Sequence, residues 1–202
     1  MRVLVLAAHP DDAEVGCGGT IAKYAGQGHT VKIVTTVIPS LHEVRLAESE
    51  AAARILGAEH ECLDIRSGDM VFNRAIVECF DRAITGFGPD LILTHWSHDS
   101  HNDHQVVAHA TVAASRKNAC SVYMYEQTIP GGITSCSFRA QKYIDISETL
   151  EKKLESIKAH ASQMRAHGDW WLYGIQGRAQ YRGFQIRKKY AEAFETVKDI
   201  EL

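Results

Sequence analysis

The sequence predicts an α/β protein of the Rossmann-like, doubly wound class, in which helices cover both faces of a mostly parallel sheet. Three observations predict this fold. Residues 2–8 form a continuous apolar run, as expected of a strand that is buried on both faces. From there to residue 125, β-branched runs alternate with helical patterns. Crossovers between parallel strands are right-handed, so this alternation places helices on both sides of the sheet.

The strands are identified by short runs of β-branched and aromatic residues. After the first run, such runs cover residues 29–37, 61–65, 91–94, 121–125 and 138–146. The helices are identified by apolar residues at helical spacing and by glycines that suit a helix end. They cover residues 20–27, 44–56, 71–84 and 104–116, and a charged helix is expected from an N-cap at Ser147 to about His160.

The remaining segments connect or follow these elements. A glycine-rich turn is expected before the first helix, and the polar segment 129–137 is expected to be a loop and is a candidate lid. Residues 168–185 show no clear pattern, whereas residues 190–197 are apolar enough to pack back on the body. Because no repeat, low-complexity tract or linker interrupts the chain, we expect one domain over residues 1–202.

Composition excludes several classes of protein. The net charge of -3, the pI near 6.4 and the lack of any Lys/Arg run predict no nucleic-acid partner. The five cysteines form no CxxC pair, which favours a reducing compartment. The N-terminal apolar run is shorter than that of a signal peptide, and no segment approaches the ~20 apolar residues that span a bilayer. We therefore expect a cytoplasmic protein without a membrane partner.

The turn after the first strand carries candidate metal ligands. Ligands of such folds bind beyond the carboxyl ends of the strands, where His9-Pro10-Asp11-Asp12 lies. Pro10 stiffens this turn, and imidazole and carboxylate groups are zinc ligands. A solvated loop whose aspartate caps a helix is the simpler alternative. The glycines at 16–19 suggest nucleotide binding, but they lack the GxGxxG spacing, and the second strand ends without an acidic residue for a ribose.

A second polar segment, HWSHDSHNDH, follows the fourth predicted strand at residues 95–104. It therefore lies at the same edge of the sheet as the first. If a helix begins near residue 101, His101 and His104 share one face of it, so that one can bind a metal while the other points at whatever the metal binds. The spacing alone does not say which histidine is the ligand, and a solvated loop is again the alternative.

Together these two segments resemble the LmbE-like, or PIG-L-like, family of zinc N-deacetylases. That family carries the motifs H-P-D-D and H-x-D-H, and both are present without gaps at residues 9–12 and 101–104. Arg45 with Glu48, and Ser162 with Gln163, are also similar to the family. The resemblance covers nearly the whole chain. It implies hydrolysis of an N-acetyl group from a small-molecule amino sugar or amino-sugar conjugate.

The resemblance also implies a role for each motif residue. The zinc ligands, which would equally hold another divalent metal such as Fe2+, are His9, Asp12 and His104. Asp11 matches the general base. His101 matches the histidine that stabilises the oxyanion, and Asp103 the acid that orients this histidine. The residues that hold substrate hydroxyls are Arg45 and, on a looser alignment, Asp69.

These groups suit amide hydrolysis, which needs a nucleophile, charge stabilisation and a proton for the leaving amine. Three protein ligands leave zinc an open position for water, whose pKa zinc lowers to about 7. A carboxylate can accept the proton during attack, and a protonated imidazole can stabilise the oxyanion. Two alternatives stay open: hydrolysis of another amide, such as a sugar–thiol conjugate, and a non-catalytic nucleotide- or sugar-binding protein.

Several other residues near the motifs have two interpretations. His95 and His98 fit a supporting or loop role better than a ligand role, and Cys17 fits packing better than a sulfur ligand. His160 suits the pocket and the surface equally. The C-terminal aromatic residues form either a sugar-stacking wall or internal packing; they are Trp170, Trp171 and Tyr173. The resemblance leaves a homo-oligomer open.

Overall fold

The computed structural model describes residues 1–127 and 130–201 and confirms the α/β fold. At its centre lies a sheet whose seven described strands run in the order β3-β2-β1-β4-β5-β7-β6. The strands are β1 (Arg2–Ala7), β2 (Thr30–Thr35), β3 (Glu59–Cys62), β4 (Leu91–His95), β5 (Ser121–Tyr125), β6 (Lys142–Asp145) and β7 (Ala191–Lys198). Neighbours among β1 to β5 are parallel, whereas β7 runs antiparallel to both β5 and β6.

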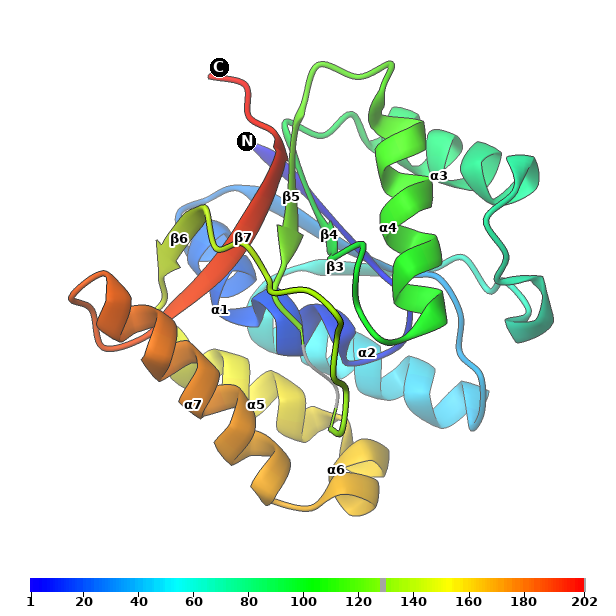
Figure 1. Cartoon of the computed structure of the whole chain (residues 1–202). Coiled ribbons are helices and arrows are strands. Elements are labelled where there is room, and N and C mark those ends of the chain that lie inside the picture. Colours follow the sequence, from blue (N-terminus) through cyan, green and yellow to red (C-terminus); the bar gives the residue numbers. More distant parts are fainter. Residues whose placement is uncertain (128–129, 202) are drawn as a thin grey trace.

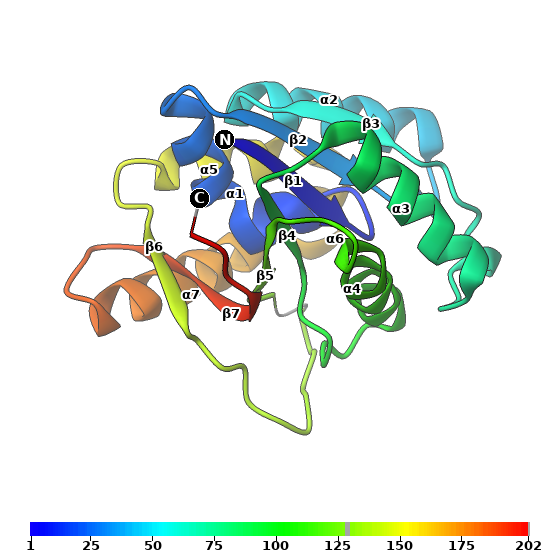
Figure 2. The same cartoon turned by 90° about the horizontal axis from the view of Figure 1, so that it is seen from above.

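Helices cover both faces of this sheet, as Figures 1 and 2 show. They are α1 (Asp12–Gly26), α2 (His42–Leu56), α3 (Arg74–Phe87), α4 (Asn102–Ser115), α5 (Leu150–Ala159), α6 (Ala161–His167) and α7 (Trp170–Gln185), with a short 3-10 turn, η1 (Ser67–Asp69). Helices α1, α2 and α5 pack together on one face, and α3 packs with α4 on the other. Successive β1 side chains enter opposite cores, Val5 toward α1 and Leu6 toward α3 and α4.

Helix α1 differs from the sequence-based expectation. It begins at Asp12 rather than at residue 20, so the glycines at 16–19 lie within α1, where a kink at Cys17 separates two helical segments. A Cβ atom at Gly16 would lie 2.3 Å from the ring of Tyr125, and one at Gly19 would lie 2.7 Å from Ile146. The glycines therefore allow α1 to pack closely against the sheet and against the segment after β6.

The C-terminal part of the chain corrects two further expectations and assigns two segments that the sequence left open. Residues 170–185 form α7, and the last strand, β7, inserts between β5 and β6. The predicted strand over residues 138–146 shortens to β6. Ser147 is not the N-cap of α5, because its hydroxyl donates to the side chain of Asp145 at 2.6 Å and the helix begins only at Leu150.

Two sequence-based expectations concern segments outside the core. The predicted loop over residues 129–137 begins outside the described residues, and its described part, 130–137, contains neither helix nor strand. Among the described helices, none is long and apolar enough to cross a membrane. All five cysteines are free thiols.

Candidate metal centre

The two polar segments meet at the carboxyl ends of β1 and β4, which are neighbours in the sheet. His9 follows β1, and Asp12 is the first residue of α1. His95 ends β4, and His104 lies in the first turn of α4. Asp12, His95 and His104 are buried. Because adjacent parallel strands end side by side, residues that are far apart in the sequence form one cluster here.

Two overlapping groups of side chains offer metal-ligand atoms within 4.8 Å of one another: His9 with His101 and His104, and Asp12 with His95 and His104. The Nε2 atom of His104 lies 3.3 Å from Oδ1 of Asp12. The Nδ1 atom of His9 lies 3.4 Å from Oδ2 of the same carboxylate. Asp12 therefore contacts both imidazoles, but neither group of ligand atoms contains His9 and Asp12 together. Imidazole nitrogens and carboxylate oxygens are donors of the kind that zinc binds.

His95 is less suited to be a ligand. The backbone N–H of Ala8 donates to its Nε2 at 2.9 Å, which engages the lone pair that a metal would need. Burial and the neighbouring His104 lower the pKa of His95 to about 4, so the ring is neutral at neutral pH. Its stacking on His104, with 4.0 Å between ring centroids, instead supports the orientation of that imidazole.

In each of the two candidate ligand histidines, a carboxylate contacts the ring nitrogen that does not face Asp12. Oδ2 of Asp99 lies 3.1 Å from Nδ1 of His104, and Oδ2 of Asp103 lies 2.9 Å from Nε2 of His9. Burial lowers the pKa of His104, but Asp12 and Asp99 outweigh it and raise that pKa to about 10. Carboxylate–histidine pairs of this kind orient the rings of metal ligands. The sequence analysis missed Asp99, because one acid among four histidines carried no separate signal.

His101 is the N-cap residue of α4, and its Nδ1 accepts the backbone N–H of Asp103 at 3.2 Å. The His101 ring stacks on that of His104, with 4.6 Å between the ring centroids, and it lines the cavity that lies over the cluster. Burial and the neighbouring histidines lower the pKa of His101. The Asp103 carboxylate was expected to orient His101, but it hydrogen-bonds to His9, so Asp103 holds His101 through its backbone.

Asp11 adopts a left-handed backbone conformation, with φ 92° and ψ -24°. Such conformations are uncommon for residues other than glycine and cluster at functional sites. The side chain lines the cavity next to Asp12. Burial, followed by the charge of Asp12, raises the pKa of Asp11 to about 7. A carboxyl group in this state can both accept and release a proton near neutral pH.

The two predicted substrate-binding residues have different locations. Arg45 lies buried on α2. Its Nη2 atom donates to the carbonyl of Pro10 at 3.1 Å and lies 3.7 Å from Oδ2 of Asp11. It lines the cavity together with Asp11. Asp69 is exposed in η1 and lies outside the set of residues that line the cavity. The structure therefore brings Arg45 to the site and leaves Asp69 on the surface.

The cavity over the cluster has a volume of about 330 Å³. Beyond the motif residues and Arg45, it is lined by Val15, Pro39, Gln127, Pro130, Gln163, His167 and Trp171. Among the aromatic residues expected near the site, Trp171 lines the wall, whereas Trp170 and Tyr173 are exposed at 59% and 72%. Gln127, which had no motif to mark it, donates to Oδ1 of Asp12 at 2.7 Å.

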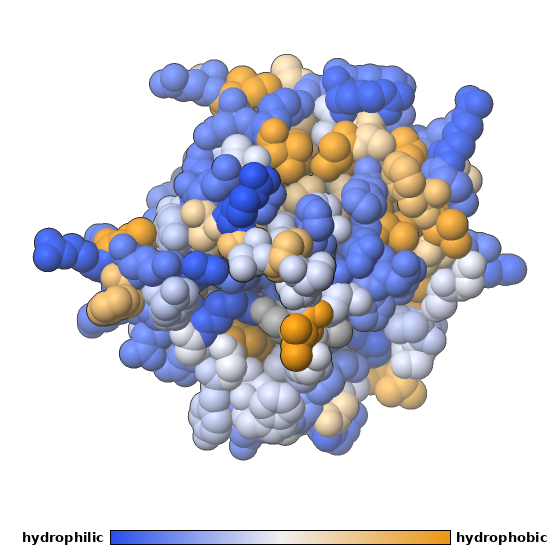
Figure 3. All heavy atoms as spheres, in the orientation of Figure 1, coloured by the Kyte–Doolittle hydropathy of each residue, from blue (hydrophilic) through white to orange (hydrophobic). Residues whose placement is uncertain are grey.

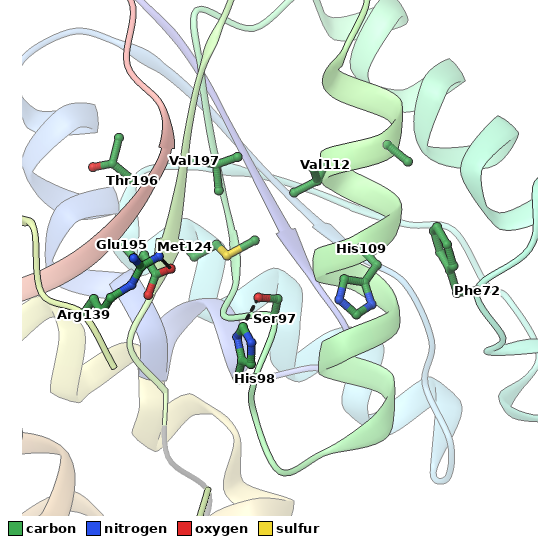
Figure 4. A pocket seen from close by; sticks show the side chains of 11 residues that line it. Phe72, Ser97, His98, His109, Val112, Met124, Arg139, Glu195, Thr196 and Val197 are labelled. Carbon is green, nitrogen blue, oxygen red and sulfur yellow. Dashed lines mark hydrogen bonds and ion pairs between the residues drawn. The ribbon is translucent and has the colours of Figure 1, made fainter. Parts of the chain in front are cut away.

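Two further histidines and one cysteine lie outside this cavity. His98 lines a second, more apolar cavity of about 800 Å³ between α4 and β7 (Figure 4), over which apolar side chains gather on the surface (Figure 3). His160 is fully buried, with Nε2 3.6 Å from Oε2 of Glu14. Cys17 is buried inside α1, where burial raises the pKa of its thiol.

Comparison with known proteins adds an independent observation. Residues 4–115 match the family model described as PIG-L: GlcNAc-PI de-N-acetylase. The chain is 26% identical to diacetylchitobiose deacetylase of Thermococcus kodakarensis, over 100% of this chain and 85% of that protein. It is also 26% identical to 4-oxalmesaconate hydratase of Pseudomonas putida, over 96% of this chain and 88% of that protein.

A solved structure extends the likeness to the fold. The conserved protein TT1542 of Thermus thermophilus superposes with a TM-score of 0.87 at 22% identity. The match covers 99% of this chain and 96% of that one. It therefore includes the sheet, both helical layers and the C-terminal elements.

Proposed function

The chain belongs to the PIG-L family, and from this premise we propose that it is a metal-dependent deacetylase of an amino sugar or amino-sugar conjugate, built as one domain over residues 1–202. The observation that carries the proposal is the position of the Asp11 carboxyl, which is 13% exposed and lines the same cavity as the cluster of metal-ligand atoms. A proton acceptor beside an N/O metal site is the arrangement that amide hydrolysis requires.

In this proposal zinc is held by His9, Asp12 and His104. This set combines two imidazoles with the carboxylate that contacts both of them. Asp103 holds the ring of His9 through its Nε2 atom, and Asp99 holds the ring of His104 through its Nδ1 atom. When bound, zinc supplies a Lewis acid that lowers the pKa of water toward neutrality.

The protein groups around the metal then divide the remaining work. Asp11 takes a proton from the attacking water and returns it to the leaving amine, for which a pKa near neutrality is suited. His101 faces the same cavity and stabilises the negative charge that develops on the carbonyl oxygen. Arg45 keeps Asp11 in place and binds substrate hydroxyls. Trp171 offers an aromatic wall for the sugar ring.

The test measures acetate release from N-acetylglucosamine, diacetylchitobiose and glycolipid or thiol conjugates of N-acetylglucosamine. The protein is assayed zinc-loaded, chelator-treated and as Asp11→Asn. Release that depends on both zinc and Asp11 supports the proposal. If zinc binds and no N-acetylated compound is hydrolysed, the deacetylase proposal is rejected.

A second candidate function is hydration of an unsaturated dicarboxylic or tricarboxylic acid. It is favoured by one observation, the similarity to 4-oxalmesaconate hydratase over most of both chains. A metal and a carboxyl base beside Arg45 also suit an anionic substrate. The same zinc-loaded protein is therefore assayed with 4-oxalmesaconate by loss of ultraviolet absorbance, and turnover there without acetate release selects this function.

A further inference from the structure

Helix α1 is broken next to the candidate metal centre. At Cys17 the backbone has φ -146° and ψ 24°, outside the helical range. The break separates residues 12–16 from the rest of the helix. The first segment begins with Asp12, follows directly on Asp11, and contributes the side chain of Val15 to the cavity wall. The position of this short segment therefore determines where the two aspartates lie.

A buried ion pair lies in the break. In a regular α-helix, the N–H of Gly19 would donate to the carbonyl of Val15, four residues earlier. Here the N–H of Gly19 donates to Oε1 of Glu192 at 3.0 Å, and the carbonyl of Val15 accepts from Nζ of Lys153 at 2.9 Å. The ammonium group of Lys153 also donates a hydrogen bond to Oε1 of Glu192. The pair thus binds both the donor and the acceptor of this backbone position.

Further contacts secure both ends of the break. The second oxygen of Glu192 accepts the N–H of Thr20 at 2.7 Å, and Nη2 of Arg178 donates to the Val15 carbonyl at 3.1 Å. The carboxylate therefore meets the N-terminal end of the second helical segment, and the cations meet the C-terminal end of the first. Each charge has the sign that the helix dipole favours at that end. A side chain inserted between backbone partners is a recognised cause of helix kinks.

The neighbouring structure makes room for this pair. Lys153 is 2% exposed and Glu192 is 5% exposed, and they come from α5 and β7. A Cβ atom at Gly18 would lie 3.2 Å from Cγ of Lys153, so the glycine leaves space for the lysine stem. Burying an ion pair costs so much desolvation that apolar replacement is often neutral or stabilising. Stability alone is therefore a poor explanation for the pair.

We propose that Lys153 and Glu192 are positioning residues, which hold α1 in its broken form and thereby set Asp11 and Asp12 relative to His104. The inference rests on the proposed function in one respect, because it concerns the same zinc site. Within the described part of the chain, the hydrogen bonds of the two side chains join them to the α1 backbone and to each other. They would therefore affect the metal site through the position of residues 12–16.

The test uses the full chain and three variants, Glu192→Gln, Lys153→Met and the double variant Lys153→Met/Glu192→Gln. Zinc affinity is measured by competition with a chromophoric chelator, and folding by circular dichroism and thermal melting. We expect the zinc Kd to rise at least tenfold in each folded variant. Kinetically, kcat should fall by a similar factor while KM stays within twofold. The double variant should fold best, because it leaves no buried charge unpaired.

The control is Ile84→Ala, a core substitution in α3 on the opposite face of the sheet. It should lower the melting temperature and leave the zinc Kd within twofold of the wild type. A loss of zinc affinity in this control that matched its loss of stability would overturn the proposal, because zinc binding would then follow global stability. An unchanged zinc Kd in the folded pair variants would overturn it as well.

A charge swap separates positioning from simple attraction between the two side chains. The variant Lys153→Glu/Glu192→Lys keeps an ion pair, but presents an ammonium group to the N–H of Gly19 and a carboxylate to the carbonyl of Val15. We expect no recovery of zinc affinity, whereas wild-type affinity in a folded swap variant would refute the proposal. Because zinc binding needs no turnover, failure of the deacetylase assay would reject the proposed function and leave this measurement valid.

Discussion

Replacing Asp11 with asparagine changes one property of the site while preserving its shape. Asparagine has nearly the same volume and tolerates the left-handed backbone that Asp11 adopts at φ 92°. The variant therefore removes the proton acceptor and leaves the candidate zinc ligands in place. We expect kcat to fall about 10²–10⁴-fold, the usual contribution of a general base, with zinc content unchanged.

The same substitution should stabilise the metal-free protein in a pH-dependent way. Burial and the charge of Asp12 raise the pKa of Asp11 from 3.8 to about 7. A rise of this size corresponds to at most roughly 4 kcal/mol. The native state holds this proton more tightly than the unfolded chain does. The contribution of Asp11 is therefore most favourable below pH 3.8 and is lost as the pH rises through about 7.

Asparagine does not titrate, so the variant should gain stability over the wild type as the pH increases. Urea unfolding of chelator-treated protein at pH 5 and pH 8 measures the difference. The matched control is Asp64→Asn, at another aspartate with positive φ (51°) whose side chain is 72% exposed. Its exposed pair with His42, at 3.0 Å, should change the stability difference between the two pH values by less than about 1 kcal/mol. A stability difference that is equal at both pH values would refute the raised pKa, and a near wild-type kcat would refute the role of Asp11 as base.

Three further substitutions test other parts of the site. His104→Ala should lose zinc, because His104 belongs to both groups of ligand atoms; full occupancy by metal analysis would assign the ligand role to another histidine. His101→Ala should retain zinc and lower kcat about 10²–10³-fold, and steady-state kinetics that show less than a twofold change would exclude it from the oxyanion. Gly16→Ala would place a methyl group 2.3 Å from the ring of Tyr125. Denaturant unfolding should show a loss of about 1–3 kcal/mol, and unchanged stability would contradict the close packing of α1.

The fold class and the meeting of the two motifs were predictable because both follow from local patterns. Alternating strands and helices predict a parallel sheet, and His9 and His104 each lie just beyond a predicted strand. The roles of these residues stay predictions. Asp99 lies in the predicted segment, but one acid among four histidines gave no reason to choose it. Gln127 reaches Asp12 only through tertiary folding.

The elements that were mispredicted depend on contacts between distant segments. Glycines at residues 16–19 locally favour a turn, yet they join two helical segments at a kink at Cys17, and Tyr125 and Ile146 pack against that face. The insertion of β7 between β5 and β6 brings Glu192 to the break in α1. Such contacts between distant segments leave no periodic signal in the sequence.

The place of β7 in the sheet has a consequence for biosynthesis. Residues 191–198 follow every other helix and strand in the described chain, yet they join β5 to β6 and supply Glu192. The ribosome therefore makes the candidate zinc ligands well before it makes the strand whose Glu192 contacts α1, the helix that begins with Asp12. Contacts between distant parts of a chain also form late in folding. If Glu192 positions α1 as proposed, the geometry of the metal centre is complete only after residues 191–198 have been made.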